Sequence, residues 1–135
     1  MSDYRSNEYG GGIYGYTDEN GIPKYGYTIW RGVKGPDDVG HTPMDMSPGL
    51  PNMIPWHTHF PTGNGRENYE NQFFSTKEAA ERVGLRQSYR KNFDIDEFKR
   101  NQLTGGAYLI TPFNELRYFP DPVRDARQHT VIHKY

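Results

Sequence analysis

Proline and glycine divide this chain into short segments, which limits the folds that it can adopt. The 135 residues include 15 glycines and 10 prolines, and both residue types interrupt regular helices and strands. Aromatic residues make up 15% of the chain, so we expect them to supply much of the buried area. A chain of this length fits one domain with one core. We therefore predict a single domain over residues 1–135, built of short elements and many loops.

Alternating apolar residues and turn signals predict the strands. Segments 10–17 and 24–32 flank the turn sequence DENG, which favours a β-hairpin. The sequence MIPWHTH (53–59) resumes an extended pattern. Residues 105–119 predict two further strands around a turn at 112–114.

Two capping boxes predict two helices. Ser75 and Glu78 have the spacing of such a box, and Asp94 and Glu97 repeat it. The predicted helices span residues 75–84 and 94–103. A mixed or antiparallel sheet that carries the histidine strand, with these helices packed against it, is an α+β fold.

Three segments carry no periodic pattern. Residues 34–55 contain five prolines and residues 60–72 are polar and glycine-bearing, so both predict loops. The polar tail 120–135 predicts no element. Because the two loops flank the strand at 53–59, we expect them to select the substrate.

Charge and cysteine content exclude several classes of function. The 16 basic and 17 acidic side chains give a net charge of −1, which argues against nucleic acid or an anionic membrane as the partner. The sequence shows no apolar run of membrane-spanning length and no signal peptide, so it predicts a soluble chain. Because the chain has no cysteine, a metal ion would have to be held by His, Asp or Glu.

The sequence WHTHF suggests such a metal site. In a strand, His57 and His59 would point to the same face. Two histidines and one carboxylate, for which Glu78 is the nearest candidate, would leave an open position on zinc, as in catalytic sites. Taken alone, a His-x-His pair is more typical of an ordinary strand surface. His129 and His133 have helical spacing, but the polar tail favours an exposed face there.

The order of the motifs resembles a known family. The sequences EYGGGI, HTH and STKE follow one another like the JAMM motif of the JAB/MPN metalloproteases. Together with GAYLITPFNELRYFP, they are similar to the JAB-like domains found at the C-termini of Rhs-type polymorphic toxins of bacteria. The resemblance covers residues 7–120. It implies a JAB/MPN-like mixed β-sheet flanked by two or more helices.

The same resemblance implies a role for each motif residue. His57, His59 and Glu78 would ligate Zn²⁺, with Glu78 in the place that an aspartate holds in the family. Glu8 would accept a proton from the attacking water, and Ser75 would stabilise the developing oxyanion.

The predicted function is a zinc-dependent hydrolase, of peptidase or isopeptidase type. It would act on a peptide or protein as the effector domain of a secreted toxin that is delivered into a target cell, with a cognate immunity protein as partner. Two alternatives remain open. A metal-dependent nuclease toxin could use asparagines near the histidines, and a catalytically inactive JAB-like binding module could follow from the replaced ligand.

Overall fold

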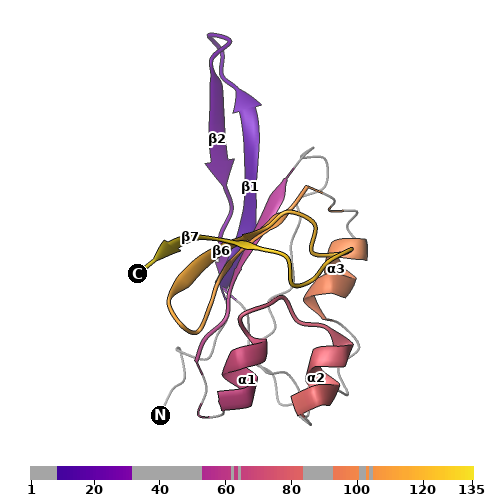
Figure 1. Ribbon diagram of the computed structural model, residues 1–135. Coiled ribbons are helices and arrows are strands. Elements are labelled where there is room, and N and C mark those ends of the chain that lie inside the picture. The colour runs from indigo at the N-terminus through magenta and orange to yellow at the C-terminus, as the bar shows by residue number, and fades with distance from the viewer. Residues whose placement is uncertain are drawn as a thin grey trace.

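The protein combines one mixed sheet with short helices (Figure 1). The computed structural model describes residues 9–31, 53–61, 63, 65–83, 93–100, 103 and 105–135. The elements within these ranges are β1 (Tyr9–Thr17), β2 (Pro23–Tyr27), β3 (Trp30–Arg31), β4 (Ile54–Thr58), α1 (Gly65–Glu70), α2 (Lys77–Val83), α3 (Asp94–Arg100), β5 (Ala107–Ile110), β6 (Glu115–Phe119) and β7 (Thr130–Lys134). The predicted mixed sheet accompanied by helices is confirmed.

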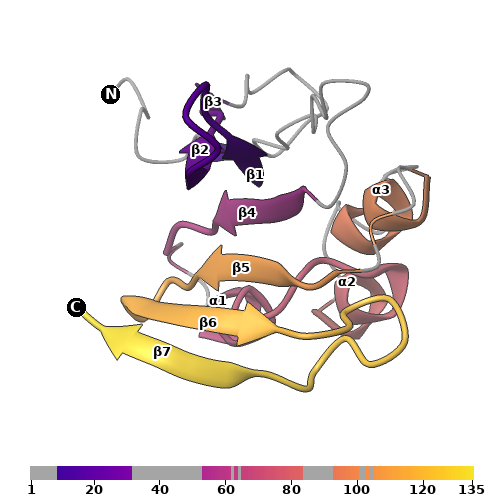
Figure 2. The same ribbon diagram turned by 90° about the horizontal axis from the view of Figure 1, so that it is seen from above.

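The strands of the described segments follow the order β2-β1-β4-β5-β6-β7, and β3 pairs with β1. Only β4 and β5 are parallel, and the other paired strands are antiparallel. Figure 2 shows β4, β5, β6 and β7 side by side. Parallel neighbours require a long crossover connection, and the connection from β4 to β5 contains α1, α2 and α3. All three helices therefore return the chain from the end of the histidine strand to its neighbour.

The N-terminal hairpin is confirmed. β1 and β2 are antiparallel, with Tyr14 opposite Gly26. In the turn, the carboxylate of Asp18 accepts hydrogen bonds from the backbone N–H groups of Asn20 and Ile22. In Figure 1 the tip of this hairpin points away from the three helices.

The helix at 75–84 is confirmed in position, but its predicted cap is wrong. α2 begins at Lys77, and Thr76 Oγ1 accepts a hydrogen bond from the N–H of Ala79 at 3.1 Å. This contact makes Thr76 the N-cap. Ser75 and Glu78 therefore do not form a capping box, because the helix begins one residue later than their spacing requires.

The helix predicted at 94–103 is confirmed as α3, again with a different cap. Asp94 is already the first helical residue. The N–H of Phe93 donates to the Asp96 carboxylate at 3.2 Å, and the N–H of Glu97 donates to the Phe93 carbonyl at 3.1 Å. Phe93 and Asp96 thus occupy the positions predicted for Asp94 and Glu97, which frees the Asp94 side chain for another contact.

Two segments without a sequence pattern contain regular structure. The predicted loop at 60–72 includes the short helix α1, and the tail adds β7 at the edge of the sheet. His133 lies in β7, so the helical spacing of His129 and His133 does not apply. The predicted connection at 34–55 lies mostly outside the described residues.

The core lies between the sheet and the crossover connection. It consists of Phe74, Ile95, Phe98, Ala107, Leu109 and Phe119. The Phe74 ring lies 4.9 Å from that of Phe98 and 5.0 Å from that of Phe119, centroid to centroid, in edge-to-face geometry, which is favourable for aromatic pairs. No helix of the described segments is long and apolar enough to cross a membrane.

Candidate metal centre

Strand β4 presents both histidines to the core. His57 is fully buried and His59 is 6% exposed, whereas Trp56 and Thr58 between and beside them are half-buried. This alternation follows from the two-residue period of a strand. The prediction that His57 and His59 share one face is confirmed.

The third member of the group is Asp94, the first residue of α3. Asp94 is buried, with its side chain 2% exposed. Asp94 Oδ1 lies 3.4 Å from His57 Nδ1, and Asp94 Oδ2 lies 3.1 Å from His59 Nε2. Among the described residues, these three side chains form the group whose ligand atoms could hold a metal ion, all within 4.8 Å of one another.

Ser75 holds Asp94 in place through two reciprocal hydrogen bonds. The N–H of Asp94 donates to Ser75 Oγ at 2.8 Å, and the N–H of Ser75 donates to Asp94 Oδ2 at 2.9 Å. A third bond joins the N–H of Ile95 to the Ser75 carbonyl at 3.3 Å. The segment between α1 and α2 is therefore fastened to the start of α3 at the point where Asp94 meets the histidines.

Asp94 carries its negative charge inside the protein. Burial alone would raise the pKa of this carboxyl by disfavouring the ion. The charge of His57, together with the hydrogen bond and charge of His59, outweighs burial and holds the pKa of Asp94 well below its usual range. A buried anion of this kind requires a cationic partner, which two imidazoles can supply as imidazolium or through a shared metal ion.

The tautomer of His59 follows from its second ring nitrogen. His59 Nδ1 lies 2.9 Å from the backbone carbonyl oxygen of Asn71. A carbonyl can only accept a hydrogen bond, so Nδ1 carries the proton. Nε2 faces the Asp94 carboxylate at 3.1 Å. It either carries a second proton and donates to that carboxylate as imidazolium, or uses its lone pair to bind a metal ion shared with Asp94. Metal-ligating histidines are oriented in the same way, by donating their other N–H to a carbonyl or carboxylate.

Within the described segments, the ring nitrogens of His57 lack the hydrogen bonds that a buried imidazole normally makes. Neither nitrogen has a hydrogen-bond partner among the described residues. The 3.4 Å separation from Asp94 is an ion-pair distance rather than that of a well-formed hydrogen bond. The ring packs instead against Phe74 and Phe98, at centroid distances of 6.1 and 6.3 Å. A buried imidazole without partners costs about 1–3 kcal/mol per unsatisfied atom, and a metal ion would remove part of that cost.

Two separations within the group are close to those around a small divalent cation. Bonds of about 2.0–2.2 Å to nitrogen and oxygen in tetrahedral geometry place neighbouring ligand atoms roughly 3.3–3.6 Å apart. The two distances from the Asp94 oxygens to the imidazole nitrogens, 3.1 and 3.4 Å, are close to this range. They run to the two different oxygens of Asp94, and all three ligand atoms lie within 4.8 Å of one another, so the three side chains could hold a metal ion.

The structure does not bring Glu78 into this group. Glu78 is exposed in the first turn of α2, where its charge acts on Arg82 one turn later. Because Thr76 caps α2, Glu78 lies on the helix surface, and Asp94 takes the position beside the histidines that was predicted for Glu78.

Glu8 lies outside the described residues, so its predicted role stays a prediction. The adjacent residue, Tyr9, is described and lies at the histidine strand. The N–H of Tyr9 donates to Thr58 Oγ1 at 2.9 Å, and the Thr58 hydroxyl donates to the Tyr9 carbonyl at 3.3 Å. In the pairing of β1 with β4, Gly10 lies opposite His57, so strand β1 begins beside the histidine strand.

No protein-family model, no curated protein and no solved structure matches this chain. The resemblance to JAB/MPN metalloproteases therefore stays a prediction, and the geometry of His57, His59 and Asp94 is the basis for a function.

Proposed function

We propose that the protein is a metal-dependent hydrolase with a zinc ion held by His57, His59 and Asp94. The observation that carries the proposal is the buried contact between a carboxylate and two imidazoles, one of which has its other nitrogen fixed by the Asn71 carbonyl. Three protein ligands leave a fourth position for water or substrate, which is the pattern of catalytic zinc sites. When bound, zinc supplies Lewis-acid polarisation of the scissile group and a water of lowered pKa.

The chain's own residues would prepare the site before substrate arrives. Ser75 and Asn71 orient two of the ligands from outside the group. Burial of the three ligands keeps bulk water away from them, which strengthens their electrostatic interactions. Such preorganisation is the main way in which enzymes stabilise charge that develops in a transition state.

Two further roles belong to the proposal. Glu8 would act as the general base, which is supported by the position of its neighbour Tyr9 beside Thr58. Ser75 would donate a hydrogen bond to the oxyanion, because a hydroxyl that accepts one bond retains its own O–H donor. A base and an oxyanion donor on either side of a polarised carbonyl are the parts that amide hydrolysis needs.

The substrate class and setting rest on the motif resemblance. We propose a peptide or isopeptide bond as the target, and a role as the effector domain of a secreted bacterial toxin that a cognate immunity protein would neutralise. The near-neutral net charge favours this proposal over a nuclease, because binding to nucleic acid depends strongly on positive charge.

The test compares metal-free and zinc-loaded protein on two substrates. A diverse peptide mixture analysed by mass spectrometry should be cleaved only by the zinc-loaded wild type, and His57→Ala should be inactive. Plasmid DNA should stay intact in the same buffer. Degradation of the plasmid would instead favour the nuclease alternative, and tight zinc binding without cleavage of either substrate would favour the binding module.

A further inference from the structure

The end of helix α1 connects the metal centre to a buried arginine. The N–H of Asn71 donates to the Glu67 carbonyl at 2.9 Å, so Asn71 continues the hydrogen bonding of α1. The last carbonyls of a helix have no partner within it. Here the Asn71 carbonyl accepts from His59, and the next carbonyl, that of Gln72, accepts from Arg117 Nη1 at 3.1 Å.

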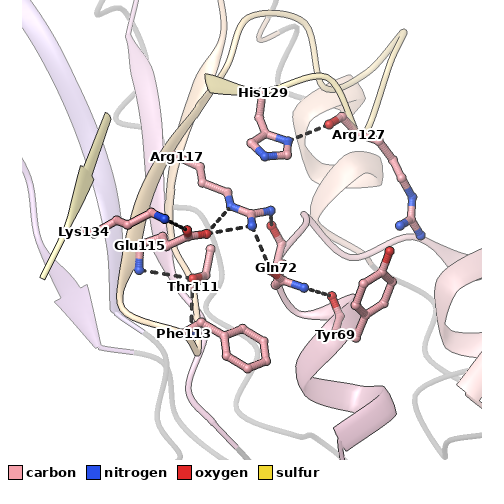
Figure 3. A network of polar contacts seen from close by, with 9 residues as sticks. All are labelled: Tyr69, Gln72, Thr111, Phe113, Glu115, Arg117, Arg127, His129 and Lys134. Atoms are coloured by element: carbon pink, nitrogen blue, oxygen red, sulfur yellow. Dashed lines mark hydrogen bonds and ion pairs between the residues drawn. The ribbon is translucent and has the colours of Figure 1, made fainter. Parts of the chain in front are cut away.

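Arg117 donates two hydrogen bonds to Gln72, one to its backbone and one to its side chain. Its Nη2 donates to the side-chain oxygen of Gln72 at 2.8 Å, in addition to the bond to the backbone. The amide nitrogen of Gln72 in turn donates to the Tyr69 carbonyl at 3.2 Å. Figure 3 shows Arg117 at the centre of this network. The side-chain oxygen of Gln72 therefore bonds to β6, and its amide nitrogen bonds to α1.

Arg117 is itself held rigidly. It is 7% exposed, and its Nε and Nη2 both donate to Glu115 Oε1, at 3.1 and 2.7 Å. Lys134 lies 3.7 Å from the other oxygen of Glu115. A buried guanidinium with a paired carboxylate and further acceptors has little freedom to move.

The sheet places Arg117 in line with the metal centre. His57 on β4 is opposite Leu109 on β5, and Leu109 is opposite Arg117 on β6. Residues opposite one another in paired strands point to the same face. The segment that follows α1 thus contacts both strands: the Asn71 carbonyl bonds to His59 on one side, and the Gln72 carbonyl bonds to Arg117 on the other.

We propose that Arg117 is a positioning residue for the metal centre. By fixing the Gln72 carbonyl, it fixes the preceding Asn71 carbonyl, and thereby the proton on His59 Nδ1 and the direction of Nε2. The inference rests on the proposed metal site for its effect on affinity, but not for its effect on the His59 ring. Lysine would not replace Arg117, because it lacks the planar fork that binds two acceptors and a carboxylate together.

The experiment compares Arg117→Lys and Arg117→Met with Arg127→Met. Arg127 is the matched control, because it stacks on the Phe73 ring at 4.3 Å, as Arg117 does at 5.5 Å, but bonds to Glu70 instead of Gln72. Two quantities are measured in full-length protein that retains its near-ultraviolet circular dichroism. They are the solvent exchange rate of the His59 Nδ1 proton in metal-free protein, by NMR, and the zinc dissociation constant.

We expect both Arg117 variants to exchange the His59 Nδ1 proton at least about tenfold faster. We also expect them to bind zinc about tenfold more weakly, at the lower end of the loss that follows removal of a direct partner of a metal-ligating histidine, because Arg117 acts on His59 only through Gln72 and Asn71. Arg127→Met should match the wild type in both. Should Arg117→Met fail to fold, Arg117→Lys still provides the comparison.

The two readouts separate this inference from the proposed function. If the wild type binds zinc and the Arg117 variants match it in exchange rate and affinity, the positioning role is wrong and the metal site stands. If the wild type binds no zinc but the Arg117 variants expose the His59 proton, the proposed function fails and the positioning of His59 stands.

Discussion

At the scale of single residues, Ser75 joins the segment before α2 to Asp94, one of the three candidate metal ligands. It accepts a hydrogen bond from the N–H of Asp94 and donates its own N–H to the Asp94 carboxylate. The second bond uses the backbone N–H and survives every substitution except proline, whereas the first depends on the hydroxyl. Ser75 therefore has a positioning role that is independent of the proposed contact with an oxyanion.

Replacement of Ser75 separates these two roles. Ser75→Ala leaves the N–H of Asp94 without its acceptor, so we expect zinc affinity to fall about tenfold or more and unfolding free energy to fall by about 1 kcal/mol. Ser75→Thr retains the hydroxyl and is the control. Zinc titration and urea unfolding of both variants provide the measurement. Unchanged affinity in Ser75→Ala would show that Ser75 does not position Asp94.

The histidine pair could be predicted from the sequence, whereas Asp94 could not. His57 and His59 are adjacent on one face of a strand, so their spacing alone places them together. Asp94 lies 35 residues beyond His59 and reaches it only through the crossover connection. Its position before an apolar helical pattern was the one signal in the sequence, and that signal also fits an ordinary helix cap.

At the scale of elements, β1 shows why the sequence GGG precedes the hairpin. A Cβ atom on Gly11 would lie 1.8 Å from the Thr28 carbonyl oxygen and 2.7 Å from Trp56 Nε1. The backbone carbonyl cannot move aside without disturbing the pairing of β1 with its neighbours. Gly11 is therefore required by close packing across the sheet.

Alanine substitutions along β1 test this requirement. We expect Gly11→Ala to lower the unfolding free energy by about 3 kcal/mol or more, because overpacking at a backbone contact strains the sheet. Gly15→Ala is the matched control in the same strand, since its Cβ would meet no described atom closer than 3.8 Å. Thermal and urea unfolding provide the measurement, and equal stability of the two variants would contradict the packing argument.

Most elements could be predicted, and the exceptions have physical causes. The hairpin, the histidine strand, β5, β6 and the two later helices follow from alternation, turn residues and apolar spacing. Helix α1 was missed because it buries no residue, so it leaves no apolar pattern. β7 was missed because all of its residues are exposed and the strand depends on pairing with β6.

At the scale of the whole molecule, Glu70 joins three distant parts of the chain. Its carboxylate bonds to Arg82 on α2 at 3.1 Å and to Arg127, near β7, at 2.7 Å. Burial alone would raise the pKa of Glu70, but the hydrogen bonds and charges of the two arginines lower it below 4.5, its ordinary value. The paired carboxylate therefore stabilises the fold in its ionised form.

The sign of the pH dependence follows from that shift. Because the pKa is lower in the folded state, the stabilisation is fully present above about pH 4.5 and is lost as the pH falls through the folded pKa. We expect the stability advantage of the wild type over Glu70→Gln to be constant above about pH 5 and to shrink as the pH falls below about 4.5. Glu81→Gln is the control, because Glu81 forms only an exposed pair with Lys77 at 4.0 Å. Urea unfolding in the presence of a chelator provides the measurement, and a constant advantage across this range would contradict the assignment.

The fold brings strand β4, the crossover connection and the start of α3 to one buried point. The proposed function requires that point to bind a metal ion. The most direct test is the zinc content per chain of the wild type, Asp94→Asn and Glu78→Gln, measured by elemental analysis after incubation with zinc and removal of the excess. We predict that the wild type and Glu78→Gln retain close to one zinc ion per chain, and that Asp94→Asn loses it. Loss of zinc from Glu78→Gln but not from Asp94→Asn, or no zinc in the wild type, would contradict the account.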